Sequence, residues 1–227
     1  MNGESIAKIS IIVARILEIS FCYDNGVRSK VKYIIGIDEV GRGPLAGPVT
    51  LCACVLAKNA ADKILATDFR GIDDSKKLSP KEREKFFKIA RKKMGEGVIS
   101  YAVAHVSARV IDRIGISKAI KKGIERVLER LLHTPSSCEV LLDGSLKAPE
   151  VYKKQKTIIG GDALLPIISL ASVIAKVTRD KKMIRLSKKF PQYGLEIHKG
   201  YGTAFHYAQI RSHDLCELHR RSFMGEG

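Results

Sequence analysis

Short apolar runs recur along the chain and predict the strands of a β-sheet. Residues 33–37 and 49–56 are rich in β-branched and other apolar side chains, and each run predicts one strand. The Gly/Pro-rich loop between them leaves no room for a crossover helix, so these two strands should pair antiparallel. Residues 98–106 alternate like a half-buried strand, and residues 140–142 and 156–159 fit two further short strands.

Helical signals lie between and after these runs. Residues 79–82 form a capping box with proline at the first helical position, which predicts a helix that ends near Met94. Residues 117–132 and 165–189 fit two more helices, and Thr203 is placed to cap a last short one. Strands and helices mixed in this order predict one α/β domain, with a mixed sheet and helices on its faces.

The chain before residue 33 does not continue this pattern. Its apolar stretch, residues 6–21, is interrupted by charged side chains and is too short to span a membrane. The same stretch lacks a convincing cleavage site for a secretory signal. We therefore expect a helical N-terminal extension over residues 1–32, with a leader outside the folded domain as the alternative, followed by the folded domain over residues 33–227.

The charge of the chain narrows the kind of partner that it binds. The sequence holds 40 Lys and Arg against 24 Asp and Glu, which gives a formal net charge of +16. A positive field of this size attracts polyanions, and nucleic acid is the commonest of them. A generally basic protein without such a partner remains the alternative on charge alone.

Cysteine usage indicates the compartment. The chain has 5 cysteines and no CxxC pair, which disfavours a disulfide framework or a structural zinc site. Cys52 and Cys54 lie in an apolar run and are expected in the core. We therefore expect a protein of a reducing compartment, the cytoplasm, with no membrane association.

Four carboxylates stand at the ends of predicted elements. Asp38 and Glu39 end the first strand, Asp143 follows residues 140–142, and Asp162 comes after two glycines and just before a helix. Each has a structural interpretation by itself, because Asp is common in turns at strand ends and at helix N-caps. Carboxylates are rarely buried unless they are paired or metal-bound, so their recurrence in three segments indicates a site.

Carboxylate oxygens are hard ligands, which suit Mg²⁺ or Mn²⁺ rather than zinc. A cluster of acids would also repel the backbone of a nucleic acid unless metal ions bridged the two, which is the logic of two-metal phosphodiester cleavage. We therefore predict a metal-dependent nuclease site at these four acids. Asp180 is a further candidate, although a surface charge pair with Lys176, four residues earlier, or a supporting role is the favoured interpretation.

The loop after the first strand, residues 41–48, is rich in glycine and proline. It is not a nucleotide-binding loop of the Walker type, because Pro48 and a strand follow where Lys-Ser/Thr and a helix are required. It is either a tight hairpin connection or a loop whose glycines let the backbone approach a ligand, with Arg42 free to meet a phosphate. Directly after the acids, such a loop could read the 2′-hydroxyl that separates RNA from DNA.

Six sequence motifs occur in a fixed order between residues 33 and 223. They are IDEVGRGPLAGPV at 37–49, DSKKLSPKER at 74–83, LLDG at 141–144, IGGDALLPIISLASVIAKVTRDKKM at 159–183, FPQYGLEIHKGYGTAFH at 190–206 and HRRSF at 219–223. Together they resemble bacterial ribonuclease HII, the type 2 ribonuclease H. The resemblance implies a ribonuclease-H-like mixed β-sheet flanked by helices, which makes residues 33–227 the catalytic domain.

The resemblance also implies roles for particular residues. The four acids would be the ligands of two Mg²⁺ or Mn²⁺ ions, and no histidine is assigned a catalytic role. Tyr201 would stack near the deoxyribose on the 3′ side of the ribonucleotide. The remaining substrate-binding positions are of two kinds, with Gly41, Arg42 and Gly43 sensing the 2′-hydroxyl and Lys76, Ser172 and Lys176 lying near phosphates.

The activity that the resemblance implies is endonucleolytic. The enzyme would hydrolyse RNA in RNA–DNA hybrids and cut on the 5′ side of ribonucleotides embedded in duplex DNA, leaving 3′-hydroxyl and 5′-phosphate ends. We expect it to act as a monomer. One alternative is a nuclease or recombinase of the same fold that acts on DNA junctions. The other is a non-catalytic nucleic-acid-binding protein, which would bind without metal.

Overall fold

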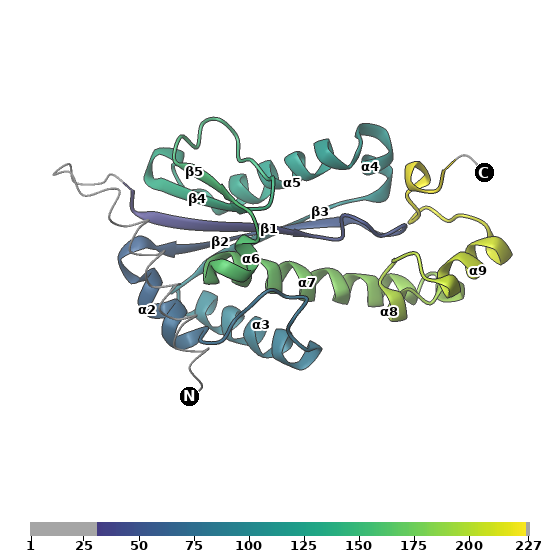
Figure 1. The fold of residues 1–227 in the computed structure, drawn as a ribbon, viewed down its shortest axis with the longest axis horizontal. Helices are drawn as coiled ribbons and strands as arrows, with labels where there is room; N and C mark the ends of the chain where they lie inside the picture. The colour runs from purple at the N-terminus through teal and green to yellow at the C-terminus, as the bar shows by residue number, and fades with distance from the viewer. Residues whose placement is uncertain (1–30, 226–227) are drawn as a thin grey trace.

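A mixed sheet forms the centre of the domain (Figure 1). The computed structural model describes residues 31–225, so nearly all of the predicted N-terminal extension lies outside the described residues. The strands are β1 (Tyr33–Val40), β2 (Val49–Ala57), β3 (Ser100–Val106), β4 (Cys138–Asp143) and β5 (Gln155–Ile158). Their order across the sheet is β3-β2-β1-β4-β5. β2 pairs antiparallel with β1 and β3, whereas β4 pairs parallel with β1 and β5.

Helices cover both faces of the sheet (Figure 1). One face is covered by α4 (Ala108–Ile114) and α5 (Ile116–Leu131). The other face is covered by α2 (Lys58–Asp68), α3 (Pro80–Gly95) and α7 (Pro166–Ser187). The remaining helical segments are η1 (Pro135–Ser137), α6 (Gly161–Leu164), η2 (Pro191–Tyr193), α8 (Leu195–His198), α9 (Ala204–His213) and η3 (Arg221–Phe223).

Side chains of alternating strand positions fill the two cores. Leu51 of β2 packs with α5, whereas Cys52 and Cys54 of the same strand pack with α7, as expected for a strand buried on both faces. α7 lies unusually close to β1 because Gly36 has no side chain. A Cβ at Gly36 would lie 2.5 Å from the carbonyl oxygen of Ile167. This close approach brings the first turns of α7 to the strand that carries the predicted acids.

Most predicted elements are confirmed. The capping box of α3 forms in full, with Ser79 accepting from the Glu82 amide at 3.3 Å and Glu82 accepting from the Ser79 amide at 2.8 Å. Thr203 caps α9 by accepting from the His206 amide at 3.2 Å. The first strand runs to Val40, one residue beyond the pair Asp38 and Glu39 that was predicted to end it.

Among the described residues, the single-turn helices α6 and α8 were not predicted, and neither were the longer α2 and α4. α2 starts directly after β2 and has neither a side-chain cap nor an acidic residue in its first turn. α4 has Ser107 at its N-cap, but the hydroxyl makes no capping hydrogen bond, and the helix is only 7 residues long. Both helices are therefore held by packing against the sheet, which no local signal reports. Within residues 31–225, no helix is long and apolar enough to cross a lipid bilayer.

Candidate active site

The sheet brings the predicted acids to one edge. β1 and β4 run parallel, and their register pairs Ile37 with Leu142, so the next residue on each strand, Asp38 and Asp143, stands at the same level. Asp162 reaches this edge from α6, where its backbone amide donates to the Asp143 carboxylate at 3.3 Å. The helix N-cap that was considered for Asp162 is wrong, because Gly160 occupies that position with a left-handed φ of 67°.

The carboxylates are crowded and largely buried. Asp38 is 4% exposed and Asp162 is 7% exposed. Burial, with added repulsion from Glu39 and Asp143, raises the pKa of Asp38 well above its usual range. Burial also raises the pKa of Glu39 to about 7, although Arg42 opposes the shift. For Asp162, burial and the charge of Asp143 raise the pKa in the same way. The four acids therefore repel one another in a setting that penalises negative charge.

A hard divalent cation fits this donor set. Mg²⁺ and Mn²⁺ bind carboxylate oxygens, and a cation would stabilise the charged form of acids whose pKa values burial and mutual repulsion raise. Over residues 31–225 there is no group of three or more His, Cys, Asp or Glu side chains that by itself could hold a metal ion. Mg²⁺ commonly takes one or two carboxylates and completes its shell with water and substrate phosphate, so pairs of acids suffice.

Lys76 borders the acids from the segment before α3. Its ammonium lies 3.5 Å from Asp162 and 3.9 Å from Asp74. Partial burial alone would lower the pKa of Lys76, but the carboxylates of Asp74 and Asp162 outweigh it and raise that pKa. The side chain is 81% exposed, so a cationic group stands in solvent beside the site.

Ser172 and Lys176 lie on α7 on the side of the acids. The Ser172 hydroxyl donates to Ser75 at 2.8 Å, and Ser172 also acts to lower the pKa of the neighbouring Asp38. The Lys176 ammonium donates to Asp180 at 3.0 Å, which confirms the predicted charge pair. The pair is only about a fifth exposed, at 19% and 20%, so it lies partly beneath the surface. Ser75 and Asp74 were not singled out from the sequence, although the DSKK motif contains both.

The glycine-rich loop between β1 and β2 folds back on the C-terminal part of the chain. Gly41 and Gly47 have φ of 90° and 87°, in the left-handed region that favours glycine. A Cβ at Gly41 would lie 2.2 Å from Nε of Arg179. Arg42 points toward the acids, with its guanidinium 3.6 Å from the Glu39 carboxylate. Arg179 therefore packs against Gly41 on one side of the loop, and Arg42 of the same loop lies beside the carboxylates.

A second loop, residues 199–203, lies directly against the first. The backbone amide of Ala46 donates to the Gly200 carbonyl at 3.2 Å. Gly200 has a φ of 88°, and a Cβ there would lie 2.2 Å from the Ala46 carbonyl oxygen. Tyr201 is 45% exposed, so the alternative interpretation of its ring as a core anchor is wrong. The structure thus brings Tyr201 next to the glycine loop with its ring in solvent.

Three buried histidines hold this second loop in place. His206 lies 2.9 Å from the Tyr201 carbonyl through Nδ1 and 3.2 Å from Nε2 of His219 through Nε2. The Tyr201 carbonyl can only accept, so Nδ1 of His206 carries a proton and Nε2 of His206 does not. Nε2 of His219 therefore donates to Nε2 of His206. His198 stacks on His206 with ring centroids 4.2 Å apart and accepts from the Gly200 amide at 3.1 Å. The three histidine rings therefore have a structural role, because their hydrogen bonds hold the backbone on either side of Tyr201.

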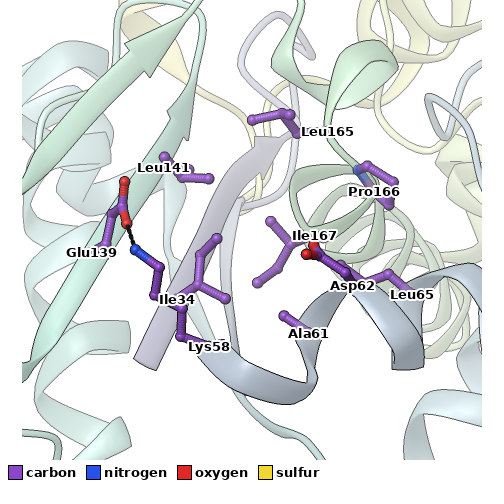
Figure 2. Close-up of a pocket in the computed structure, with 10 residues that line it drawn as sticks. All are labelled: Ile34, Lys58, Ala61, Asp62, Leu65, Glu139, Leu141, Leu165, Pro166 and Ile167. Atoms are coloured by element: carbon purple, nitrogen blue, oxygen red, sulfur yellow. Dashed lines mark hydrogen bonds and ion pairs between the residues drawn. The ribbon is translucent and has the colours of Figure 1, made fainter. Parts of the chain in front are cut away.

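A separate small pocket lies under α2 and does not include the acids (Figure 2). Its volume is about 120 Å³, and its walls are mainly aliphatic, such as Ile34, Leu65 and Ile167. Lys58 and Glu139 at its rim bond to each other at 2.8 Å. A pocket of this size and character does not suit a nucleotide, so we assign it no part in the site.

Solved structures define the class of protein. The ribonuclease H2 of Pyrococcus horikoshii OT3 matches with a TM-score of 0.62 and 25% identity, over 85% of this chain and 94% of that one. A ribonuclease HII from Archaeoglobus fulgidus, solved as a PCNA complex, matches with a TM-score of 0.66 and 24% identity, over 86% and 96%. A Bst ribonuclease HIII, solved with Mn²⁺, matches with a TM-score of 0.65 and 20% identity, over 87% and 68%. The fold is therefore ribonuclease-H-like, as predicted.

Sequence comparison then identifies the family. The family model for ribonuclease HII matches residues 35–225. The ribonuclease HII proteins of Burkholderia thailandensis and Burkholderia pseudomallei are each 42% identical over 190 residues, which cover 84% of this chain and 82% of theirs. The chain belongs to the ribonuclease HII family and is an endoribonuclease, a hydrolase. Membership supports RNA-hydrolysing endonuclease activity on RNA–DNA hybrids.

The histidine network predicts how stability depends on pH. Burial lowers the pKa of His206 to about 4, whereas a histidine in the unfolded chain titrates near 6.5. Between these values the unfolded state binds more protons, so the free energy of unfolding should fall as the pH drops from about 6.5 to 4. This ring alone should account for a loss of about 3 kcal/mol at most.

Denaturant unfolding across this pH range, on three proteins, measures the effect. The wild type and the exposed-site control His213→Gln should lose stability along the same slope, while His206→Gln should show a shallower slope. An unchanged slope in His206→Gln would contradict the assignment of a neutral, buried ring at this position.

Proposed function

We propose that this enzyme hydrolyses the RNA strand of RNA–DNA hybrids and cuts on the 5′ side of ribonucleotides embedded in duplex DNA. Its products would carry 3′-hydroxyl and 5′-phosphate ends. One observation carries the proposal. The four carboxylates Asp38, Glu39, Asp143 and Asp162 meet at one sheet edge, beside two backbone loops that are packed against each other.

The proposed cofactor is a pair of Mg²⁺ or Mn²⁺ ions held by these four acids. When bound, the ions would supply a water of lowered pKa for in-line attack and stabilise the leaving 3′-oxygen. The pKa values of Asp38, Glu39 and Asp162 are raised by burial first and by neighbouring acids second, and this favours the role, because a bound cation would stabilise the charged carboxylates. The Mn²⁺ in the ribonuclease HIII structure is consistent with it.

Cationic and hydroxyl side chains on the chain would hold the nucleic-acid backbone. The Lys76 ammonium stands in solvent 3.5 Å from Asp162, so it can contact a phosphate that reaches the acids. Ser172 and Lys176 lie on α7 on the same side and are proposed as further phosphate contacts. The net charge of +16 would strengthen this attraction over a wide area, and binding should weaken steeply as salt rises.

Recognition of the ribonucleotide is assigned to the two packed loops. The backbone of Gly41, Arg42 and Gly43 would read the 2′-hydroxyl, because glycine lets the backbone approach a sugar closely. Nothing lies within 4 Å of a Cβ built at Gly43, so this part of the loop is open on one side. Tyr201, with its exposed ring, would stack on the deoxyribose that follows the ribonucleotide.

We also propose that residues 33–227 form the catalytic domain and residues 1–32 an extension to it, and that the enzyme works as a monomer. The family match, which begins at residue 35, supports this division. The cysteines of the described chain, Cys52, Cys54, Cys138 and Cys216, are all free thiols, which supports a reducing compartment such as the cytoplasm.

Asp143→Asn tests the metal-dependent cleavage. The change keeps the shape of the side chain and removes its charge, so cleavage of a duplex with one ribonucleotide in Mg²⁺ or Mn²⁺ should fall by about a thousandfold or more. Binding should be retained or improved, since repulsion of the phosphates falls. Asp62→Asn, an exposed acid on α2, is the matched control and should cut at the wild-type rate and position. Near-wild-type turnover of Asp143→Asn would remove this acid from the mechanism.

Tyr201→Ala tests the reading of the junction. Loss of a stacked ring should lower cleavage at a single embedded ribonucleotide by about tenfold to a hundredfold. Cleavage of a continuous RNA–DNA hybrid should fall less, because there the next sugar is not deoxyribose. The melting temperature should stay near that of the wild type, and Tyr201→Phe should retain the activity. Equal losses on both substrates would show that Tyr201 does not read the junction.

A further inference from the structure

Two arginine side chains are fully buried behind the glycine-rich loop. Arg179, on α7, and Arg220, just before η3, are each 0% exposed. Neither makes an ion pair with a carboxylate within the described part of the chain. A buried charge destabilises the fold unless hydrogen bonds compensate it, so the partners of these groups indicate their purpose.

Arg220 bonds to three backbone carbonyls of the loop. Its Nε donates to Gly47 at 3.0 Å, Nη1 to Arg42 at 2.8 Å and Nη2 to Gly41 at 2.6 Å. Its own backbone amide donates to the Leu45 carbonyl at 2.7 Å. One side chain from the C-terminal segment therefore fixes both ends of the loop that follows Asp38 and Glu39.

Arg179 joins this loop to the loop that carries Tyr201. Its Nε donates to Pro48 at 3.0 Å and its Nη2 to Ala46 at 3.3 Å, while Nη1 donates to Lys199 at 3.0 Å. The planar guanidinium has donors in a fixed fork, so it sets the carbonyls of both loops at a fixed relative position.

The hydrogen bonds to the loop carbonyls also set the direction in which the loop amides point. In a trans peptide the carbonyl of one residue and the amide of the next point in opposite directions. Arg220 holds the carbonyls of Gly41 and Arg42, so the amides of Arg42 and Gly43 point away from the buried guanidinium. These are the amides of the segment proposed to read the 2′-hydroxyl.

We propose that Arg179 and Arg220 are positioning residues for ribonucleotide recognition. They hold five carbonyls of the loop inward, present the amides of Arg42 and Gly43 to the ribose, and hold Tyr201 at a set distance from them. The five carbonyls are those of Gly41, Arg42, Ala46, Gly47 and Pro48. Neither arginine touches the substrate in this assignment. The inference rests on the proposed function and adds the residues that set the geometry of the sugar-reading loops.

Binding preference separates this role from a purely structural one. In an Asp143→Asn background, which removes cleavage, we would measure the Kd for a duplex with one ribonucleotide and for the all-DNA duplex of the same sequence. Lys at position 220 keeps the charge but cannot bond all three carbonyls, so Arg220→Lys should lower the preference for the ribonucleotide duplex by about tenfold. The Kd for all-DNA should not change. Arg221→Lys, the exposed neighbour, is the matched control and should keep the full preference.

A milder variant covers the case in which Arg220→Lys does not fold. Asp112 holds the segment after Arg220 by accepting from the amides of Arg221 and Ser222, each at 3.0 Å. Asp112→Ala leaves the buried guanidinium in place but loosens its segment, so the preference should fall by about threefold, in line with a modest hydrogen-bond loss.

The outcomes distinguish this inference from the proposed function. A lowered preference with unchanged all-DNA binding supports the positioning role. A full preference in folded Arg220→Lys or, where that protein does not fold, in Asp112→Ala overturns it, even if the melting temperature drops. Absence of any ribonucleotide preference in the Asp143→Asn parent would instead remove the proposed recognition, and the positioning role with it.

Discussion

Repulsion among carboxylates at one sheet edge is the constraint on which the rest of the site depends. Asp38 and Asp143 are brought together by the parallel pairing of β1 with β4, and the α6 turn adds Asp162. Burial and mutual charge raise the pKa of Asp38, Glu39 and Asp162, so the fold maintains an arrangement that is unfavourable without a cation. The repulsion among these buried acids makes this part of the sheet a candidate site for two hard divalent ions.

The surrounding structure positions what such a site needs. Gly36 lets α7 approach β1, and α7 carries Ser172, which acts to lower the pKa of Asp38. The glycine loop follows the acids immediately in sequence, so its backbone has to lie beside them. Three of the eight loop residues are glycines, and Arg179 and Arg220 fix the loop from outside through hydrogen bonds to its carbonyls. The carboxylates, the backbone of the glycine loop and the ring of Tyr201 therefore come together from segments that lie far apart in the chain.

Much of this arrangement could be predicted from the sequence because its signals are local. The strand that ends in Asp143, the capping box at Ser79 and the cap at Thr203 each depend on residues a few positions apart. The gathering of the acids followed from strand ends, and the motifs around them identified the family. Asp162 was open to two interpretations, because a residue between Gly-Gly and a helix resembles an N-cap until the φ of Gly160 is known.

The parts that could not be predicted depend on distant contacts. Arg179 bonds to Pro48 across 131 residues and Arg220 to Gly41 across 179. Both arginines lie in the sequence motifs, but no local pattern shows that their side chains are buried against the glycine loop. His206 and His219 form their pair through the same folding back of the C-terminal segment. Tyr201 could be an anchor or an exposed ring on sequence grounds, and only its burial decides between the two.

Direct binding of a divalent metal to the substrate-free protein tests the central claim most simply. We would titrate Mn²⁺ into the wild type, Asp143→Asn and the control Asp62→Asn, and follow bound ion by electron paramagnetic resonance. We expect clear binding to the wild type and Asp62→Asn and much weaker binding to Asp143→Asn, because one charged ligand is lost. Equal binding by all three proteins would show that the acids at the sheet edge are not the metal site.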